Sequence, residues 1–242
     1  MAGHIVRYIN DIAVLVLNDG ENRFNLTSIN AMTDAVNSIE RNVNAKALVI
    51  TGTGKFFSNG IDLVWLAKQD EDTTREFFQA WKRLDDKLVT FSLPTIAAIN
   101  GHAFGGGAFL ALLCDKRIMR TQKGWICVPA IHLNMELPPH LLEIARIKVQ
   151  SPKVLRDLVL FGNRFNAVDA LNAGLVDVIV DESLLLKKAR QMATDTLGKQ
   201  GIDRNMLRIM KHDLYKPIVE SDALSHDILF SQRNNALLNS KL

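Results

Sequence analysis

The feature that most constrains the fold is a repeated order of short aliphatic run, turn and helix-like segment in the first half of the chain. The runs Ile12–Leu17, Ala47–Thr51 and Thr95–Ile99 are almost wholly apolar or β-branched. Runs of this length and composition are typical of strands that are buried on both faces of a parallel sheet. The alternation therefore predicts a layered α/β domain.

Amphipathic segments separate these runs. Apolar residues recur at three- and four-residue steps in Leu26–Asn42, where we expect Thr27 or Ser28 as N-cap, and in Asp72–Thr90. We expect a buried helix at Ala108–Leu113 and one more strand at Arg117–Arg120. After about residue 140 the spacing is mostly helical, in Leu141–Val149, Pro152–Phe161, Ala167–Ala173, Glu182–Leu197 and Arg204–Tyr215. We expect an α/β core over residues 1–190 and a helical region over residues 191–242.

Composition excludes several classes of function. A net charge of +3 is too small for nucleic-acid binding through bulk electrostatics. No apolar run reaches the roughly 20 residues that cross a bilayer. Cys114 and Cys127 lie in apolar stretches and are interpreted as packed thiols. No spacing of His, Cys, Asp and Glu is typical of a metal site, so we expect none.

The chain closes with Ser240, Lys241 and Leu242. This tripeptide at a carboxyl terminus is the address that the peroxisomal import receptor reads. The prediction is a peroxisomal matrix protein with that receptor as a partner.

Two glycine-rich loops follow predicted strands. In the first, Gly52 and Gly54 can serve the turn alone, whereas Gly60 precedes a helix-like segment whose first amides can receive negative charge. The second is Gly105–Gly107, which lacks the spacing of a dinucleotide or phosphate loop. It allows close approach of a ligand to the backbone, or equally the tight packing of helix on strand.

With their flanks, these loops resemble the crotonase superfamily, also called the enoyl-CoA hydratase/isomerase family, and within it the peroxisomal enoyl-CoA delta isomerases. The blocks that match the superfamily follow its order over nearly the whole chain: Lys55–Leu63, Pro94–Ala103, Gly105–Gly107 with Cys114 and Asp115, Gly162–Phe165 and Ala170–Asp177. Asn22–Phe24 and Arg146–Val149 have further counterparts in the delta isomerases. The resemblance implies a crotonase-like ββα spiral core. It also implies trimers, or pairs of trimers, that bind acyl-CoA.

The resemblance places a thioester oxygen between the backbone amides of Ile61 and Gly106, an oxyanion hole that stabilises an enolate. It implies further substrate-binding positions around the two loops and the loop after Pro129: Asn22, Arg23, Phe24, Ser58, Asn59, Gly60, Asp62, Leu63, Gly105 and His132. Lys211 resembles a family lysine that meets phosphate, although a solvated helix face explains it equally well.

The acid and base groups depart from the family. Hydratases carry glutamates at the positions of Phe109 and Ala130, so we expect no hydration, which needs a water held between two carboxylates. Isomerases need one base, and Glu136 lies near the glutamate that some family members use. A solvated loop carboxylate is the other interpretation of Glu136. His132 is a second-rank base, and Glu143 a poorer one on an exposed helix face.

Two functions remain open from the sequence. The first is an isomerase that shifts the double bond of a 3-enoyl-CoA to the trans-2 position without metal, nucleotide or redox cofactor. The second is an acyl-CoA-binding homologue that kept the thioester site and lost its base. A thioesterase or dienoyl-CoA isomerase would need carboxylates that the sequence does not place.

Overall fold

The computed structural model describes residues 3–224, and its centre is a large sheet. In spatial order its strands are β1 (Gly3–Ile9), β2 (Ile12–Asn18), β3 (Ala47–Gly52), β5 (Thr95–Ile99), β7 (Lys116–Arg120) and β9 (Val178–Val180). The β1–β2 pair is antiparallel and every other pair is parallel. The predicted α/β class is confirmed.

A second, smaller sheet contains β4 (Phe56–Ser58), β6 (His102–Phe104) and β8 (Ile126–Cys127), all parallel. Strands of the two sheets alternate along the chain, and each pair leads into helices: β3 and β4 into α2 (Leu63–Leu66) and α3 (Glu71–Val89), β5 and β6 into α4 (Gly106–Leu113), β7 and β8 into the 3-10 turn Pro129–Leu133 and α5 (Pro139–Lys148). Three ββα units therefore follow one another, which is the predicted spiral core.

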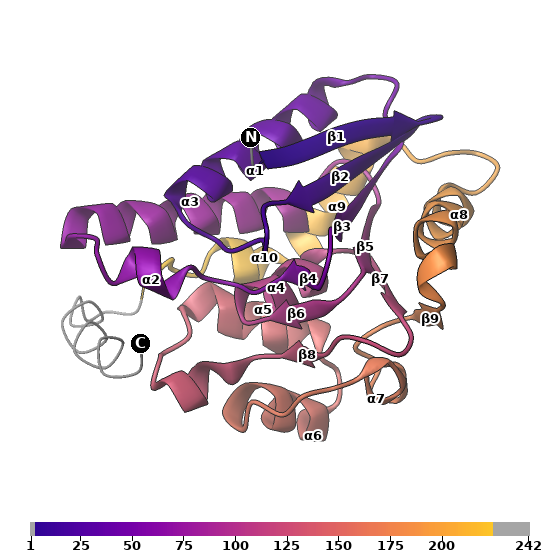
Figure 1. Cartoon of the computed structure of the whole chain (residues 1–242). Coiled ribbons are helices and arrows are strands. Elements are labelled where there is room, and N and C mark those ends of the chain that lie inside the picture. The colour runs from indigo at the N-terminus through magenta and orange to yellow at the C-terminus, as the bar shows by residue number, and fades with distance from the viewer. Residues whose placement is uncertain (1–2, 225–242) are drawn as a thin grey trace.

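Helices cover both faces of the large sheet (Figure 1). Because side chains alternate along a strand, Val14, Val49 and Ile118 face α8 (Leu185–Leu197), while their neighbours join the main core with α1 (Leu26–Arg41) and α3. Burial on both faces explains why the strands appear in the sequence as continuous aliphatic runs.

Helix α1 shows where local prediction was inaccurate. Its N-cap is Asn25, not Thr27 or Ser28. The Asn25 side chain accepts a hydrogen bond from the Ser28 backbone, and the Ser28 hydroxyl accepts one from the Asn25 backbone. This reciprocal capping box satisfies two amides that would otherwise lack partners, which a single capping side chain cannot do.

The C-terminal part is helical, as expected, but its boundaries differ. The segment 152–161 is α6 (Pro152–Leu155) followed by a π-helical turn, and 182–184 is a 3-10 turn before α8. Three further helices complete the described chain: α7 (Ala167–Asn172), α9 (Arg204–Leu214) and α10 (Lys216–Val219). The boundary expected at residue 190 falls inside α8, which packs on the large sheet through Leu185 and Ala193 alike.

Two expectations about single residues can be compared directly with the structure. Cys114 and Cys127 are buried free thiols, as predicted. Lys211 is neither solvated nor available to phosphate, because its ammonium donates to Asp115 at 2.6 Å and to the Leu93 carbonyl at 3.1 Å. It ties α9 to the start of β7 and β5. Within residues 3–224, no helix combines the length and apolarity that a bilayer crossing requires.

Candidate active site

The two glycine-rich loops meet in space. Strands β4 and β6 are parallel neighbours, so the loops at their carboxyl ends, which contain Gly60 and Gly105, emerge side by side. A Cβ atom at Gly60 would come within 2.9 Å of the Gly106 nitrogen and 2.7 Å of the Phe104 carbonyl. Gly60 also has φ +71°, a conformation that L side chains rarely adopt. Glycine at this position therefore brings Ile61 next to Gly106.

Backbone bonding leaves two amides available at this junction. The Phe24 amide donates to the Gly60 carbonyl at 2.7 Å, and the Asp62 amide donates to the Phe24 carbonyl at 2.8 Å. These bonds flank Ile61 as in a parallel bridge, so the Ile61 N–H points away from Phe24. Gly106 is the first residue of α4 and has no intrahelical acceptor. Within residues 3–224, neither amide has a hydrogen-bond partner.

The glycine triplet meets three separate requirements. Gly105 has φ +51°. A Cβ at Gly106 would lie 2.9 Å from both the Phe24 and Trp81 rings, and one at Gly107 would lie 2.3 Å from the Ser58 carbonyl. Tight packing accounts for the absence of side chains behind the loop. The Gly106 amide has no partner among the described residues, and the approach of a ligand to it stays a prediction.

A pocket of about 250 Å³ opens in front of these amides. Its wall is largely aromatic and aliphatic: Ile61, Leu63, Phe78, Trp81, Phe104, Phe109, Val128, Leu133, Leu137 and Leu141. Arg23 and Glu136 are the charged residues among those that line it. Apolar walls with few polar groups are typical of small-molecule sites.

Helix α3 supplies a wall that sequence reasoning missed. Phe78 and Trp81 are buried, and Phe24 packs edge-on against Trp81 with 5.7 Å between ring centroids. In the sequence these aromatics indicated only the apolar face of a helix. Nothing in that periodicity distinguishes a ring that fills the core from a ring that also borders a cavity.

Several residues predicted to bind substrate do line the pocket. Ile61, Leu63, Gly105 and Gly106 lie there with Arg23 and Asn59. Arg23 forms an ion pair with Glu21 at 2.7 Å, and the Asn59 amide donates to the same carboxylate at 2.8 Å. The Asn59 hydrogen bond, together with the Arg23 charge, lowers the pKa of Glu21. This network fixes two polar side chains at the pocket edge.

The other predicted binding residues lie outside the lining and are engaged within the protein. Asn22 donates to the Phe56 and Phe57 carbonyls, the Ser58 hydroxyl donates to the Asn22 carbonyl at 2.7 Å, and Asp62 caps α2 through the Trp65 amide at 3.0 Å. The Phe24 ring packs against Gly106, and Gly60 lies beside the Gly106 nitrogen. These residues shape the loops rather than form the cavity surface.

The candidate bases are separated clearly by the fold. Glu136 lies at the rim of the pocket and is exposed. His132 is exposed and does not line the pocket; its ring is close to Gly162, where a Cβ would lie 3.0 Å from it. Glu143, on α5, forms an ion pair with Arg146. Phe109 and Ala130 both line the pocket, and Phe109 is fully buried.

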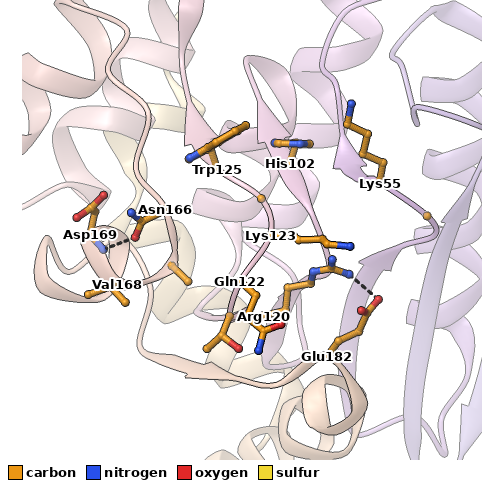
Figure 2. Close-up of a pocket in the computed structure, with 14 residues that line it drawn as sticks. Lys55, His102, Arg120, Gln122, Lys123, Trp125, Asn166, Val168, Asp169 and Glu182 are labelled. Atoms are coloured by element: carbon orange, nitrogen blue, oxygen red, sulfur yellow. Dashed lines mark hydrogen bonds and ion pairs between the residues drawn. The ribbon is translucent and has the colours of Figure 1, made fainter.

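A second cavity, of about 1080 Å³, lies at the opposite ends of the small-sheet strands. Figure 2 shows residues that line it. We call it the polar cavity; its lining includes Lys55, His102, Arg120, Lys123, Trp125, Asp169 and Glu182. Arg120 pairs with Glu182, and the Asp169 amide donates to Asn166 at 3.0 Å. Burial, followed by the charges of Lys55, Arg164 and Arg120, lowers the pKa of His102.

In the described part of the chain no cluster of three or more His, Cys, Asp or Glu residues could hold a metal.

The two-sheet spiral is the crotonase fold, as comparison with known proteins shows. The profile named enoyl-CoA hydratase/isomerase matches residues 8–235. Enoyl-CoA delta isomerase 2, peroxisomal, from Arabidopsis thaliana is 30% identical over 174 residues, which cover 69% of this chain and 72% of that protein. A putative enoyl-CoA hydratase from Thermus thermophilus is 31% identical over 189 residues, covering 76% and 74%.

A solved structure gives the same fold. Human mitochondrial delta3-delta2-enoyl-CoA isomerase superposes with a TM-score of 0.83 at 21% identity, covering 98% of this chain and 89% of that one. The chain belongs to the enoyl-CoA hydratase/isomerase family.

Proposed function

We propose that the protein is an enoyl-CoA isomerase that converts 3-enoyl-CoA to trans-2-enoyl-CoA. The observation that carries the proposal is the pocket itself. The amides of Ile61 and Gly106, which have no hydrogen-bond partner within residues 3–224, border an apolar cavity with the Glu136 carboxylate at its rim. The positions that hold glutamates in hydratases are Phe109 and Ala130, so two carboxylates do not flank a water there.

In the proposed reaction the thioester oxygen accepts hydrogen bonds from the Ile61 and Gly106 amides. Glu136 removes a proton from C2, and the electrons of that C–H bond pass into an enolate whose oxygen the amides stabilise. The protonated Glu136 then returns the proton to C4, where the electron pair of the former C3–C4 double bond forms the new C–H bond. The C1–C2 electron pair of the enolate becomes the C2–C3 double bond, and the thioester carbonyl re-forms. The carboxylate is regenerated and no atom is gained or lost. The CoA thioester is the substrate, and the reaction needs no metal, nucleotide or redox cofactor.

The decisive experiment is a paired assay on purified protein. Turnover of cis- and trans-3-hexenoyl-CoA is followed by the absorbance of the conjugated product, and hydration of trans-2-hexenoyl-CoA is followed by its loss. We expect isomerisation without hydration. Tight acyl-CoA binding in calorimetry with no isomerisation would instead select the binding homologue, and dominant hydration would place the protein with the hydratases.

Location and assembly are part of the same proposal. Two Arabidopsis relatives carry the word peroxisomal in their names, and the tripeptide Ser240–Leu242, which lies outside the described residues, is the predicted signal. A fluorescent protein fused to the N-terminus should enter peroxisomes, and removal of Leu242 should leave it in the cytosol.

We also propose a homotrimer or a pair of trimers. The exposed apolar side chains of α9 support this assembly: Met206, Ile209, Met210 and Leu214. Light scattering coupled to gel filtration measures the mass, and a monomer would contradict the proposed assembly.

A further inference from the structure

A buried acid–base pair lies behind the pocket, away from the candidate catalytic groups. Asp85 on α3 is 1% exposed and His140 on α5 is 0% exposed, with 3.3 Å between the Asp85 Oδ2 and His140 Nε2 atoms. That distance permits a charge interaction. The geometry does not satisfy a hydrogen bond, and within the described residues neither ring nitrogen of His140 has another partner.

The pair connects the two walls of the pocket. Trp81, one helical turn before Asp85, meets the His140 ring edge-on with 6.2 Å between centroids, and Trp81 also packs behind Gly106. His140 follows the loop segment Met135–Pro138, which lines the pocket and carries Glu136. Asp85 and His140 thus join α3 to the end of the loop that bears the proposed base.

Stability alone does not explain such a pair. Removing two ionisable groups from water is costly, and apolar residues of the same volume often serve stability as well or better. Burial raises the pKa of Asp85, while its contact with His140 opposes that effect. Polar groups that lack partners in a core need an explanation, and the site beside them provides one.

We propose that Asp85 and His140 are positioning residues that hold the Met135–Pro138 loop against α3 and thereby set the place of Glu136. The inference rests on the proposed function, because the position of Glu136 matters only if that carboxylate moves a proton. Neither residue touches the substrate. Their effect is on the distance between the base and the reacting carbons, to which proton transfer is very sensitive.

The same helix offers a matched control. Lys82 forms an ion pair with Asp86 and donates to the Val219 carbonyl at 3.0 Å, so it ties α3 to α10 rather than to the loop. Lys82→Gln removes an ion pair of the same helix without removing any atom of Asp85 or His140.

The test compares Asp85→Asn, His140→Ala and Lys82→Gln in steady-state kinetics, with thermal unfolding of each. Asp85→Asn keeps the side-chain shape and serves if His140→Ala does not fold. For Asp85→Asn we expect kcat to fall about 10-fold or more, with KM nearly unchanged, as for an interaction that matters only in the transition state. Lys82→Gln should keep the wild-type kcat at a similar loss of Tm. An unchanged kcat in Asp85→Asn, or an equal loss in Lys82→Gln, would overturn the inference.

Hydrogen exchange separates this inference from the proposed function. Amides of Met135–Leu137 should exchange faster in Asp85→Asn than in the wild type or in Lys82→Gln, whether or not the protein isomerises enoyl-CoA. Absent turnover in the wild type would refute the function alone. Equal exchange in Asp85→Asn and the wild type would refute the positioning role.

Discussion

The apolar pocket and the polar cavity lie at opposite ends of the same three strands. The carboxyl ends of β4, β6 and β8 run into the apolar pocket, whereas their amino ends border the polar cavity (Figure 2). Each strand has a lining residue of each cavity at or next to its two ends. Lys55, His102 and Trp125 line the polar cavity, and Asn59, Gly105 and Val128 line the apolar pocket.

The difference lies in what supplies the polar groups. At the amino ends they are side chains, and Arg120 is neutralised by Glu182. At the carboxyl ends they are main-chain amides of turns and of the α4 N-terminus, set in apolar surroundings. Donors in such surroundings stabilise a developing oxyanion more strongly than donors in water. Ligands of open α/β sheets likewise bind outside the carboxyl ends of the strands.

The largest expected difference between the two ends concerns carboxylates. Glu136→Gln should lower kcat by about 100-fold or more, the usual contribution of a general base. Glu182→Gln, at the polar cavity, should leave kcat unchanged and cost less than about 1 kcal/mol of stability. Steady-state isomerase kinetics with a 3-enoyl-CoA measure both. Full activity of Glu136→Gln would dismiss Glu136 as the base.

The next difference concerns two glycines with positive φ, Gly60 at +71° and Gly54 at +66°. In Gly60→Ala the new methyl group would press on the Gly106 amide, and kcat/KM should fall about 100-fold or more through the lost donor. Gly54 lines the polar cavity and has open space around it. Gly54→Ala shares the backbone strain of about 1 kcal/mol without the clash. Equal losses of activity in both would show that strain, rather than the amide, is responsible.

A smaller effect concerns pH and stability. The pKa of His102 is lowered in the folded state, so the unfolded chain binds its proton more readily. The free energy of unfolding should therefore decrease as pH falls through the unfolded-state value of about 6.5. In His102→Gln this decrease, measured by chemical denaturation at several pH values between 5 and 8, should be smaller. An identical pH dependence would mean that His102 takes up its proton in the folded protein as readily as in the unfolded chain.

The smallest effect is expected for Lys123, a polar-cavity residue with no ion pair among residues 3–224. Lys123→Ala should change kcat/KM by no more than about twofold. It should change the free energy of unfolding by no more than about 0.5 kcal/mol, as for ordinary surface substitutions. A loss of activity near that of Glu136→Gln would contradict the difference between the two ends, because it would show that residues at the amino ends of the strands take part in the reaction.

The sequence predicted the strands that form continuous aliphatic runs and the helices whose apolar residues recur at three- and four-residue steps. The aliphatic runs of β2, β3 and β5 and the helices α1 and α3 were found within one or two residues. The short strands β4, β6 and β8 were missed because two or three residues are too few to show alternation. Strand β1 was missed as well, since it pairs on one side only and mixes polar with apolar residues.

The candidate site divides in the same way. The two loops could be located in the sequence because their backbone conformation and close packing require glycine. The resemblance to the family then assigned Ile61 and Gly106. The α3 wall and the pair of Asp85 and His140 could not be located, since they depend on contacts between helices far apart in the chain. The role of Glu136 stays a prediction, because its side chain is exposed at the pocket rim.

Gly107 lies in close contact with the Ser58 carbonyl. The approach brings the two loops together without using a functional group, so the relative position of the Ile61 and Gly106 amides does not depend on the side chains that border the pocket. Under the proposed function, Phe109 can therefore stand where hydratases carry an acid, and Glu136 can act from a neighbouring loop, without any change to the two amides.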